Sequence, residues 1–189
     1  MEDYLIETPS IDYVNFHIQE RVQELKNQSD DNLDYIKRSY IFVRDEIPHS
    51  WDIKTEVVSR TASDVLKNKT GICWTKSCLL AALLRANGIP SGISYQLLTR
   101  ADDGGEGYMI HALNTVYLKD FNKWIRLDAR GNKENINARF SLDEECLAYS
   151  IRAEFGEIDY HDNHADLDER LVRILKCENV FEITTDFEF

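Results

Sequence analysis

The sequence lacks the features that would place the protein in a membrane or on nucleic acid. No apolar run among its 189 residues is long enough to span a bilayer, and the first residues have neither a basic region nor the apolar stretch of a signal peptide. No basic cluster is present. A surface that binds nucleic acid or an anionic membrane requires such a cluster. We therefore expect a cytoplasmic protein without a nucleic-acid or membrane partner.

Cysteine is scarce, and no two cysteines have the spacing of a metal-binding pair. The four cysteines are Cys73, Cys78, Cys146 and Cys177. Free thiols without a secretion signal fit a reducing compartment. His161 and His164 have carboxylates beside them, but no further ligand stands out. We expect these two histidines in an exposed acidic loop, with no metal and no cofactor.

Basic residues are sparse in the last quarter of the chain. Residues 141–189 carry 14 acidic and four basic residues, a formal charge of −10, whereas residues 1–140 carry 20 and 18, a formal charge of −2. A solvated acidic surface is the simpler interpretation. The alternative is an acidic rim that repels anionic substrates and attracts cationic ones.

Hydrophobic spacing predicts helices in the first half of the chain. An apolar stripe with Ser10 as its cap predicts a helix over residues 10–28. Thr61 starts a short helix in a pattern similar to a capping box. A third apolar stretch opens at Cys73 and stops at Asn87-Gly88, which is a common way for a helix to end.

The middle of the chain is dense in β-branched and aromatic residues, which predict strands at residues 92–99, 108–118 and 124–129. A glycine-rich loop, residues 101–107, joins the first two strands. Two further elements are expected later: a strand within residues 147–160 and a helix within residues 166–176.

Together these elements indicate one α+β domain over residues 1–189. N-terminal helices, including the helix that bears Cys73, pack on an antiparallel β-sheet. We place the core at about residues 31–131, preceded by the helix at 10–28 and followed by an acidic C-terminal extension, 141–189.

Cys73 follows Gly71 and opens a helix, so its sulfur is expected at a helix N-terminus. Unpaired N–H groups and the positive end of the helix dipole favour the thiolate there, and the thiolate is the nucleophilic form. His111 lies in the second predicted strand and Asp128 in the third. A nucleophile, a general base and an orienting carboxylate thus occur in order. The structural alternatives are a core cysteine, a buried histidine and a turn aspartate.

This ordered set resembles the transglutaminase-like superfamily, the papain-related thiol enzymes in which a helix carries Cys and two neighbouring strands carry His and Asp. The matching segments are Thr61-Ala-Ser-Asp-Val-Leu66, Gly71-Ile-Cys73, Leu79-Leu-Ala-Ala-Leu-Leu-Arg85-Ala-Asn-Gly-Ile-Pro90, His111-Ala112 and Trp124-Ile-Arg-Leu-Asp128. The resemblance covers about residues 35–131. It implies a transglutaminase-like, cysteine-proteinase-like fold with Cys73, His111 and Asp128 as the catalytic triad.

The resemblance also implies an activity, thiol-dependent acyl transfer on the amide bond of a peptide, a protein or a small amide. Members of this size are more often hydrolytic, so we expect a peptidase, amidase or deamidase. Transfer to an amine, as in a transglutaminase, is one alternative, and a catalytically silent binding module with the same fold is the other. No calcium site is apparent, so calcium activation is not supported.

An acyl-transfer site also needs donors for the oxyanion. The backbone N–H of Cys73 is available at the helix N-terminus, and Trp51 is similar to the upstream aromatic donor of some relatives. The side-chain candidates are His49, Trp51 and Gln96. Trp74 forms either a wall of the substrate cleft or part of the core. Arg130 either holds Asp128 by a charge-assisted bond or caps the sheet as a surface charge.

Overall fold

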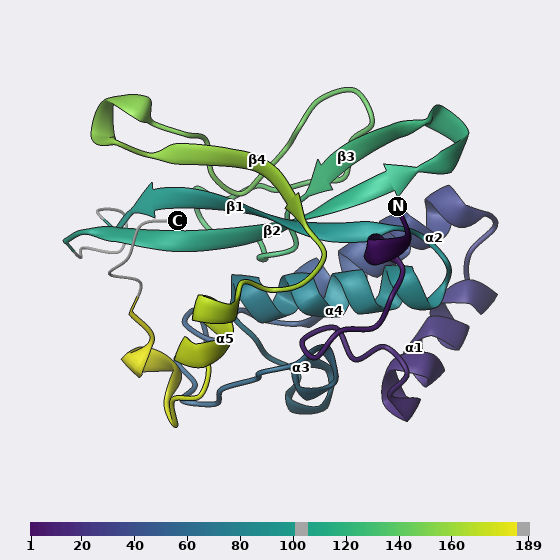
Figure 1. Ribbon diagram of the computed structural model, residues 1–189, viewed down its shortest axis with the longest axis horizontal. Coiled ribbons are helices and arrows are strands. Elements are labelled where there is room, and N and C mark those ends of the chain that lie inside the picture. Colours follow the sequence, from purple (N-terminus) through teal and green to yellow (C-terminus); the bar gives the residue numbers. More distant parts are fainter. Residues whose placement is uncertain (101–105, 185–189) are drawn as a thin grey trace.

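In the computed structural model, which describes residues 1–100 and 106–184, helices cover one face of a four-stranded antiparallel sheet (Figure 1). The strand order is β3-β2-β1-β4. The strands are β1 (Ser91–Thr99), β2 (Tyr108–Leu118), β3 (Lys123–Leu127) and β4 (Ile158–His164). The main helices are α1 (Phe16–Asn27), α2 (Asn32–Ile41), α3 (Ala62–Asn68), α4 (Cys73–Ala86) and α5 (Glu169–Ile174). The expected α+β class, with helices before an antiparallel sheet, is confirmed.

Helix α4 occupies the centre of the molecule. It runs beneath β1 and β2 in Figure 1 and packs on α1 and α3 from the other side. All 12 residues from Trp74 to Arg85 are buried. A helix that is apolar on nearly every face is stable only when it is enclosed in this way. Its first residue, Cys73, lies at the edge of this packed centre and is only partly buried.

The caps of the early helices agree only in part with the sequence prediction. Thr61 caps α3 by accepting a hydrogen bond from the amide of Asp64, as expected. The cap of α1 is Asn15, which accepts from the amide of His17, so the expectation for Ser10 is wrong. Ser10 is buried instead, and its carbonyl accepts from the amide of Ala62, which ties the incoming chain to α3.

The last strand lies later in the chain than the sequence predicts. Strand β4 pairs with β1 at the edge of the sheet and carries His161 and His164, so the expectation of a loop at these histidines is wrong. Its sequence, Ile-Asp-Tyr-His-Asp-Asn-His, is mostly polar because none of its residues is fully buried. A polar edge strand gives little of the signal by which buried strands are recognised.

The acidic C-terminal extension packs on the main core. Leu171, Leu175 and Val180 are almost completely buried among the side chains that surround α4. Of the predicted 101–107 loop, residues 101–105 lie outside the described part, as do residues 185–189 of the extension.

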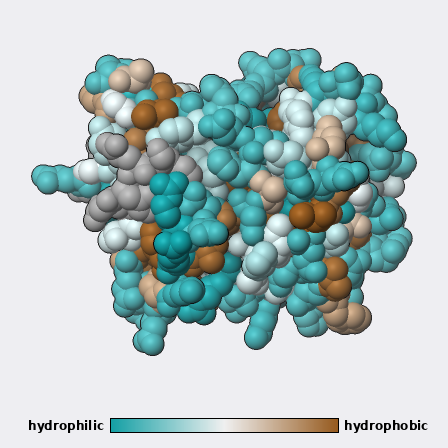
Figure 2. Space-filling view, in the orientation of Figure 1, coloured by the Kyte–Doolittle hydropathy of each residue, from teal (hydrophilic) through white to brown (hydrophobic). Residues whose placement is uncertain are grey.

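The face seen in Figure 2 is largely hydrophilic, with hydrophobic residues in small groups. Within the two described stretches, the longest helix is α4 with 14 residues. No helix there is long and apolar enough to cross a bilayer.

A buried arginine at the end of α4 joins three segments of the fold. The guanidinium of Arg85 donates to the carbonyls of Ile6, Ser91 and Ala165. We expect Arg85→Met to lower the free energy of unfolding by about 3 kcal/mol, because buried carbonyls lose their donor. Urea denaturation of the full chain measures the change.

The matched control is Arg38→Met, which removes a partly exposed arginine on α2 that pairs with Asp34 one helical turn away. Its cost should stay below about 1 kcal/mol. Equal costs for the two variants would show that Arg85 does not join these segments.

Candidate active site

Cys73 is held at the N-terminus of α4 by close packing around Gly71. A Cβ atom on Gly71 would lie 2.8 Å from Oγ1 of Thr75 and 3.1 Å from a methyl group of Val65. Only glycine therefore lets the chain approach α3 and α4 this closely before the helix begins. Ile72, the residue before the helix, provides no side-chain cap.

His49 provides the missing cap. Its Nε2 atom lies 3.2 Å from the backbone nitrogen of Cys73, whose N–H donates to it. Since an amide N–H can only donate, Nε2 carries no proton and the ring proton is on Nδ1. Burial, helped by the positive charge of Arg130, holds the pKa of His49 well below its ordinary value, so the ring is neutral. The amide expected to bind the oxyanion is therefore already bonded in this conformation.

A buried histidine–carboxylate pair lies beside Cys73. His111 Nε2 and Asp128 Oδ2 are 2.7 Å apart, and both side chains are almost fully shielded from solvent. Strands β2 and β3 bring them together, because Asn114 on β2 is opposite Leu127 on β3 and Asp128 follows directly. Asp128 also accepts from the amides of Arg130 and Ala148.

The two charges of this pair stabilise one another. Burial alone would lower the pKa of His111, but the hydrogen-bonded carboxylate of Asp128, with a further contribution from the nearby Cys73, raises it to about 10. Burial alone would raise the pKa of Asp128, but His111 and two backbone amides hold it below its ordinary value. The pair is therefore an imidazolium and a carboxylate near neutral pH.

The structure brings all three residues of the expected triad together. The His111 side chain is hydrogen-bonded to Asp128, and His111 and Cys73 line the same small cavity. Because Nε2 binds Asp128, Nδ1 is the ring nitrogen left for the sulfur of Cys73. The ring of Tyr149 packs edge-on against the imidazole, with the ring centres 5.0 Å apart. This arrangement can move a proton between sulfur and ring.

Arg130 fits neither of its two expected roles. Its amide, at 3.1 Å, and not its guanidinium, contacts Asp128. The guanidinium makes two bonds, of 2.7 and 3.0 Å, to Asp52. Arg130 is only 5% exposed, so it is not a surface charge on the sheet. Its carbonyl accepts from Lys76 at 2.8 Å.

Lys76 is the residue that the sequence analysis missed. It lies one helical turn after Cys73, is fully buried, and its Nζ donates to the carbonyls of Arg44, Ile47 and Arg130. Burial, together with the charge of Arg130, lowers the pKa of Lys76 to about 7. The sequence feature that could have identified Lys76 is its position, as a lysine, inside an otherwise apolar helix.

Two tryptophans from the sequence analysis line the site, but their N–H groups are engaged. Trp51 donates to the carbonyl of Val180 at 3.4 Å, and Trp74 donates to the carbonyl of Ile110 at 2.7 Å. Trp74 is 2% exposed and also packs in the core, so both of its expected places apply.

Gln96 lies on β1, between His111 on β2 and Asp159 on β4, which are its two cross-strand neighbours. Among the described residues that line the cavity at Cys73, Gln96 does not occur.

The cavity at Cys73 is small, with a volume of about 20 Å³. That volume holds about one water molecule. Its walls include two tryptophans, two histidines and one residue of the C-terminal extension: Trp51, Trp74, His49, His111 and Ile183. A cavity of about 520 Å³ adjoins it and shares Met109 and Tyr149 as walls.

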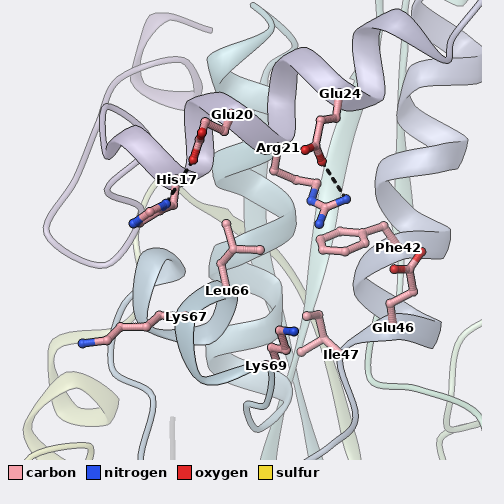
Figure 3. A pocket seen from close by; sticks show the side chains of 10 residues that line it. All are labelled: His17, Glu20, Arg21, Glu24, Phe42, Glu46, Ile47, Leu66, Lys67 and Lys69. Atoms are coloured by element: carbon pink, nitrogen blue, oxygen red, sulfur yellow. Dashed lines mark hydrogen bonds and ion pairs between the residues drawn. The ribbon is translucent and has the colours of Figure 1, made fainter.

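Another cavity, of about 480 Å³, lies between α1, α3 and the segment after α2 (Figure 3). Four of its polar side chains form two pairs, His17 with Glu20 and Arg21 with Glu24. No cysteine lines it. Elsewhere in the described ranges, no three His, Cys, Asp or Glu residues gather as a metal site would require.

Comparison with protein families gives a match over more than half of this chain. The model of the transglutaminase-like superfamily matches residues 19–129, which contain Cys73, His111 and Asp128. A search of the curated proteins finds no match.

Comparison with solved structures supports the same fold. A provisionally assigned cysteine protease from Cytophaga hutchinsonii is similar, with a TM-score of 0.55 and 18% identity, over 67% of this chain and 40% of that one. A structure described as a TGase matches with a TM-score of 0.41 and 15% identity, over 68% of this chain and 35% of that one. This chain thus spans less than half the length of either structure.

The charge state of His111 can be measured by NMR. We expect its imidazole to remain protonated at about pH 8 and to lose its proton near pH 10, whereas in Asp128→Asn it should titrate at clearly lower pH. Asp159→Asn is the control, because Asp159 pairs with Arg126 instead. An unchanged titration in Asp128→Asn would contradict the assignment of the raised pKa to Asp128.

The same raised pKa links His111 to stability. The unfolded chain binds this proton only below about pH 6.5, whereas the folded chain holds it up to about pH 10. The contribution of the protonated ring to the free energy of unfolding is therefore complete below about pH 6.5, and it is lost as the pH rises through about 10.

Lys76→Met tests whether the buried ammonium group joins the loops around the site. We expect the free energy of unfolding to fall by about 3 kcal/mol, since the bonded carbonyls lose their donor. Lys67→Met, at an exposed position of α3, should change it by less than about 0.5 kcal/mol. Similar values for the two variants in urea denaturation would refute the role of Lys76.

Proposed function

The chain belongs to the transglutaminase-like superfamily, and on that premise we propose that it is a cysteine enzyme that hydrolyses amide bonds. The observation that carries the proposal is the buried pair of His111 and Asp128, 2.7 Å apart, at the cavity that Cys73 and His111 both line. The proposed substrate is a peptide or protein amide, or a small amide. Cys73 is the proposed nucleophile, His111 the acid and base, and Asp128 the orienting group.

In the first half of the reaction, the Cys73 sulfur attacks the carbonyl carbon of the amide. The carbonyl electrons move onto oxygen, which gives a tetrahedral oxyanion. When the oxyanion collapses, the C–N bond breaks and the protonated His111 gives its proton to the leaving nitrogen. Ammonia or an amine departs and a thioester on Cys73 remains.

In the second half, water attacks the thioester carbon. Neutral His111 takes a proton from the water as the C–O bond forms, and Cys73 leaves as a thiolate. The products are a carboxylic acid and the original cysteine–imidazolium pair. Asp128 keeps the ring oriented throughout, because its hydrogen bond to Nε2 directs Nδ1 toward the sulfur.

Water is the proposed acceptor because it needs no binding site of its own, whereas an amine acceptor needs a second site beside the thioester. The adjoining cavity of about 520 Å³ supports a substrate of peptide size. Charged side chains from Lys133, Glu134, Arg152 and Glu157 line this cavity, so it suits a polar peptide segment.

The proposal is tested by mass spectrometry of peptide amides, including glutamine peptides, incubated with the protein in ¹⁸O-labelled water. Hydrolysis places one ¹⁸O atom in each new carboxylate. We expect Cys73→Ala and His111→Ala to lose at least about 10³-fold in kcat/KM, and Asp128→Asn to lose less than either.

Cys146→Ser is the matched control. Cys146 is partly exposed and contacts Arg139 and Glu144, apart from the cavity at Cys73, so its turnover should equal that of the unaltered chain. Transfer of an added amine without ¹⁸O uptake would show that the activity is amine transfer and not hydrolysis. Turnover that survives Cys73→Ala would refute the proposed nucleophile.

A further inference from the structure

The C-terminal strap, which we define as residues 175–184, lies across the cleft at Cys73. Ile183 is 6% exposed and forms one wall of the cavity that Cys73 and His111 also line. In Figure 1 the yellow strap follows α5 at the end of the molecule where α4 begins. With the strap in place, the cavity of about 20 Å³ holds about one water and cannot admit an amide substrate.

Three N–H groups at this cavity, on Trp74, Cys73 and Trp51, already have a protein partner. The Trp74 N–H is fixed in the core on the carbonyl of Ile110. The Cys73 N–H donates to His49, whose own backbone is bridged to Gly71. Both contacts belong to the frame that positions the nucleophile.

The third contact involves the strap. The indole N–H of Trp51 donates to the carbonyl of Val180 at 3.4 Å, the longest of the three bonds. Trp51 is also only partly buried. A carbonyl oxygen on this N–H occupies the place that the carbonyl of a bound amide would take. Displacement of the strap is therefore one movement that both frees a donor and removes a wall of the cavity.

Besides its buried side chains, the strap makes polar contacts with the segment just before α3. Arg60 donates to the carbonyls of Leu175 and Cys177, and the Val180 amide donates to the carbonyl of Glu56. The strap contains both buried and exposed residues, and Phe181 is 54% exposed. Its inner face has two buried side chains, Val180 and Ile183, and Ile183 lines the cavity at Cys73.

We propose that the strap is autoinhibitory: it closes the cleft in the resting protein, and an acyl donor binds only after Val180 and Ile183 have left it. This inference rests on the proposed function, because it assigns the regulation of the same site. When the strap leaves, the Trp51 N–H becomes available to the substrate carbonyl and then to the oxyanion.

The test uses the full chain with Ile183→Glu, which places a charge on the buried wall of the cleft. Phe181→Glu is the matched control, since it adds the same charge to the same strap at an exposed position. The readout is the rate at which fluorescein maleimide labels Cys73 at about pH 8.5, followed by peptide mass with Cys146 as internal reference. We expect at least about a tenfold rise for Ile183→Glu and no change for Phe181→Glu.

The labelling is repeated with His111→Ala added to each chain, so that access is measured without the proposed base. A tenfold rise in both backgrounds supports the strap, whether or not amides are hydrolysed. A rise in labelling without hydrolysis of any amide refutes the proposed function and leaves the closure standing. Equal labelling of Ile183→Glu, Phe181→Glu and the unaltered chain refutes the autoinhibitory role of the strap, even if hydrolysis is observed.

A second variant guards against loss of folding in Ile183→Glu. Arg60→Gln removes the donors to Leu175 and Cys177 at a site away from the cleft, and it should also raise the labelling rate. Arg173→Gln, on the exposed side of α5, is its control and should leave the rate unchanged. No rise with Arg60→Gln in a chain of unaltered circular dichroism contradicts the proposal.

Discussion

The buried ion pair between His111 and Asp128 is the interaction on which the rest of the site depends. Two charges removed from water are costly unless their remaining hydrogen-bonding groups are satisfied. Here Asp128 accepts from the ring and from the amides of Arg130 and Ala148. The pair therefore fixes strand β2, the end of β3 and the chain near residue 148 in one arrangement. The cysteine at the start of α4 meets a base whose position is already set.

A second set of buried charges holds α4 to its surroundings. Lys76 bonds to the carbonyls of Ile47 and Arg130, and Arg130 pairs with Asp52. His49 follows Ile47 by two residues and accepts the amide of Cys73. The sulfur, the capping histidine and the residues around Asp128 are thus connected through groups that lie on different segments. Because these groups share partners, we expect substitutions among them to be non-additive.

The sequence was sufficient to predict the parts of the structure that follow from local patterns. The limits of α4, with glycine before it and Asn87-Gly88 after it, follow from capping and periodicity. The position of His111 in β2 follows from strand composition and from the family resemblance, whereas Asp128, expected within the third strand, directly follows the end of β3 at Leu127. These elements adjoin because consecutive antiparallel strands pair with each other.

The remaining features depend on contacts between distant segments, which local patterns do not encode. Strand β4 is polar, so its sequence resembles a loop. The Arg130 guanidinium extends to Asp52, 78 residues away in the chain, and not to Asp128 two residues away. The sequence makes Trp51 a candidate oxyanion donor, but its N–H is bonded to the carbonyl of Val180, 129 residues later. Such partners come within reach of a long side chain only when the folded chain brings distant segments together.

The most direct test of the account compares the alkylation of Cys73 by iodoacetamide with and without its base. The rate is measured at about pH 6.5 in Ile183→Glu and in the same chain with His111→Ala, because both then have the same access to the sulfur. The account predicts that loss of His111 slows alkylation by at least about tenfold. Equal rates in the two chains would contradict it, because the reactivity of the sulfur would then not depend on the imidazole of His111.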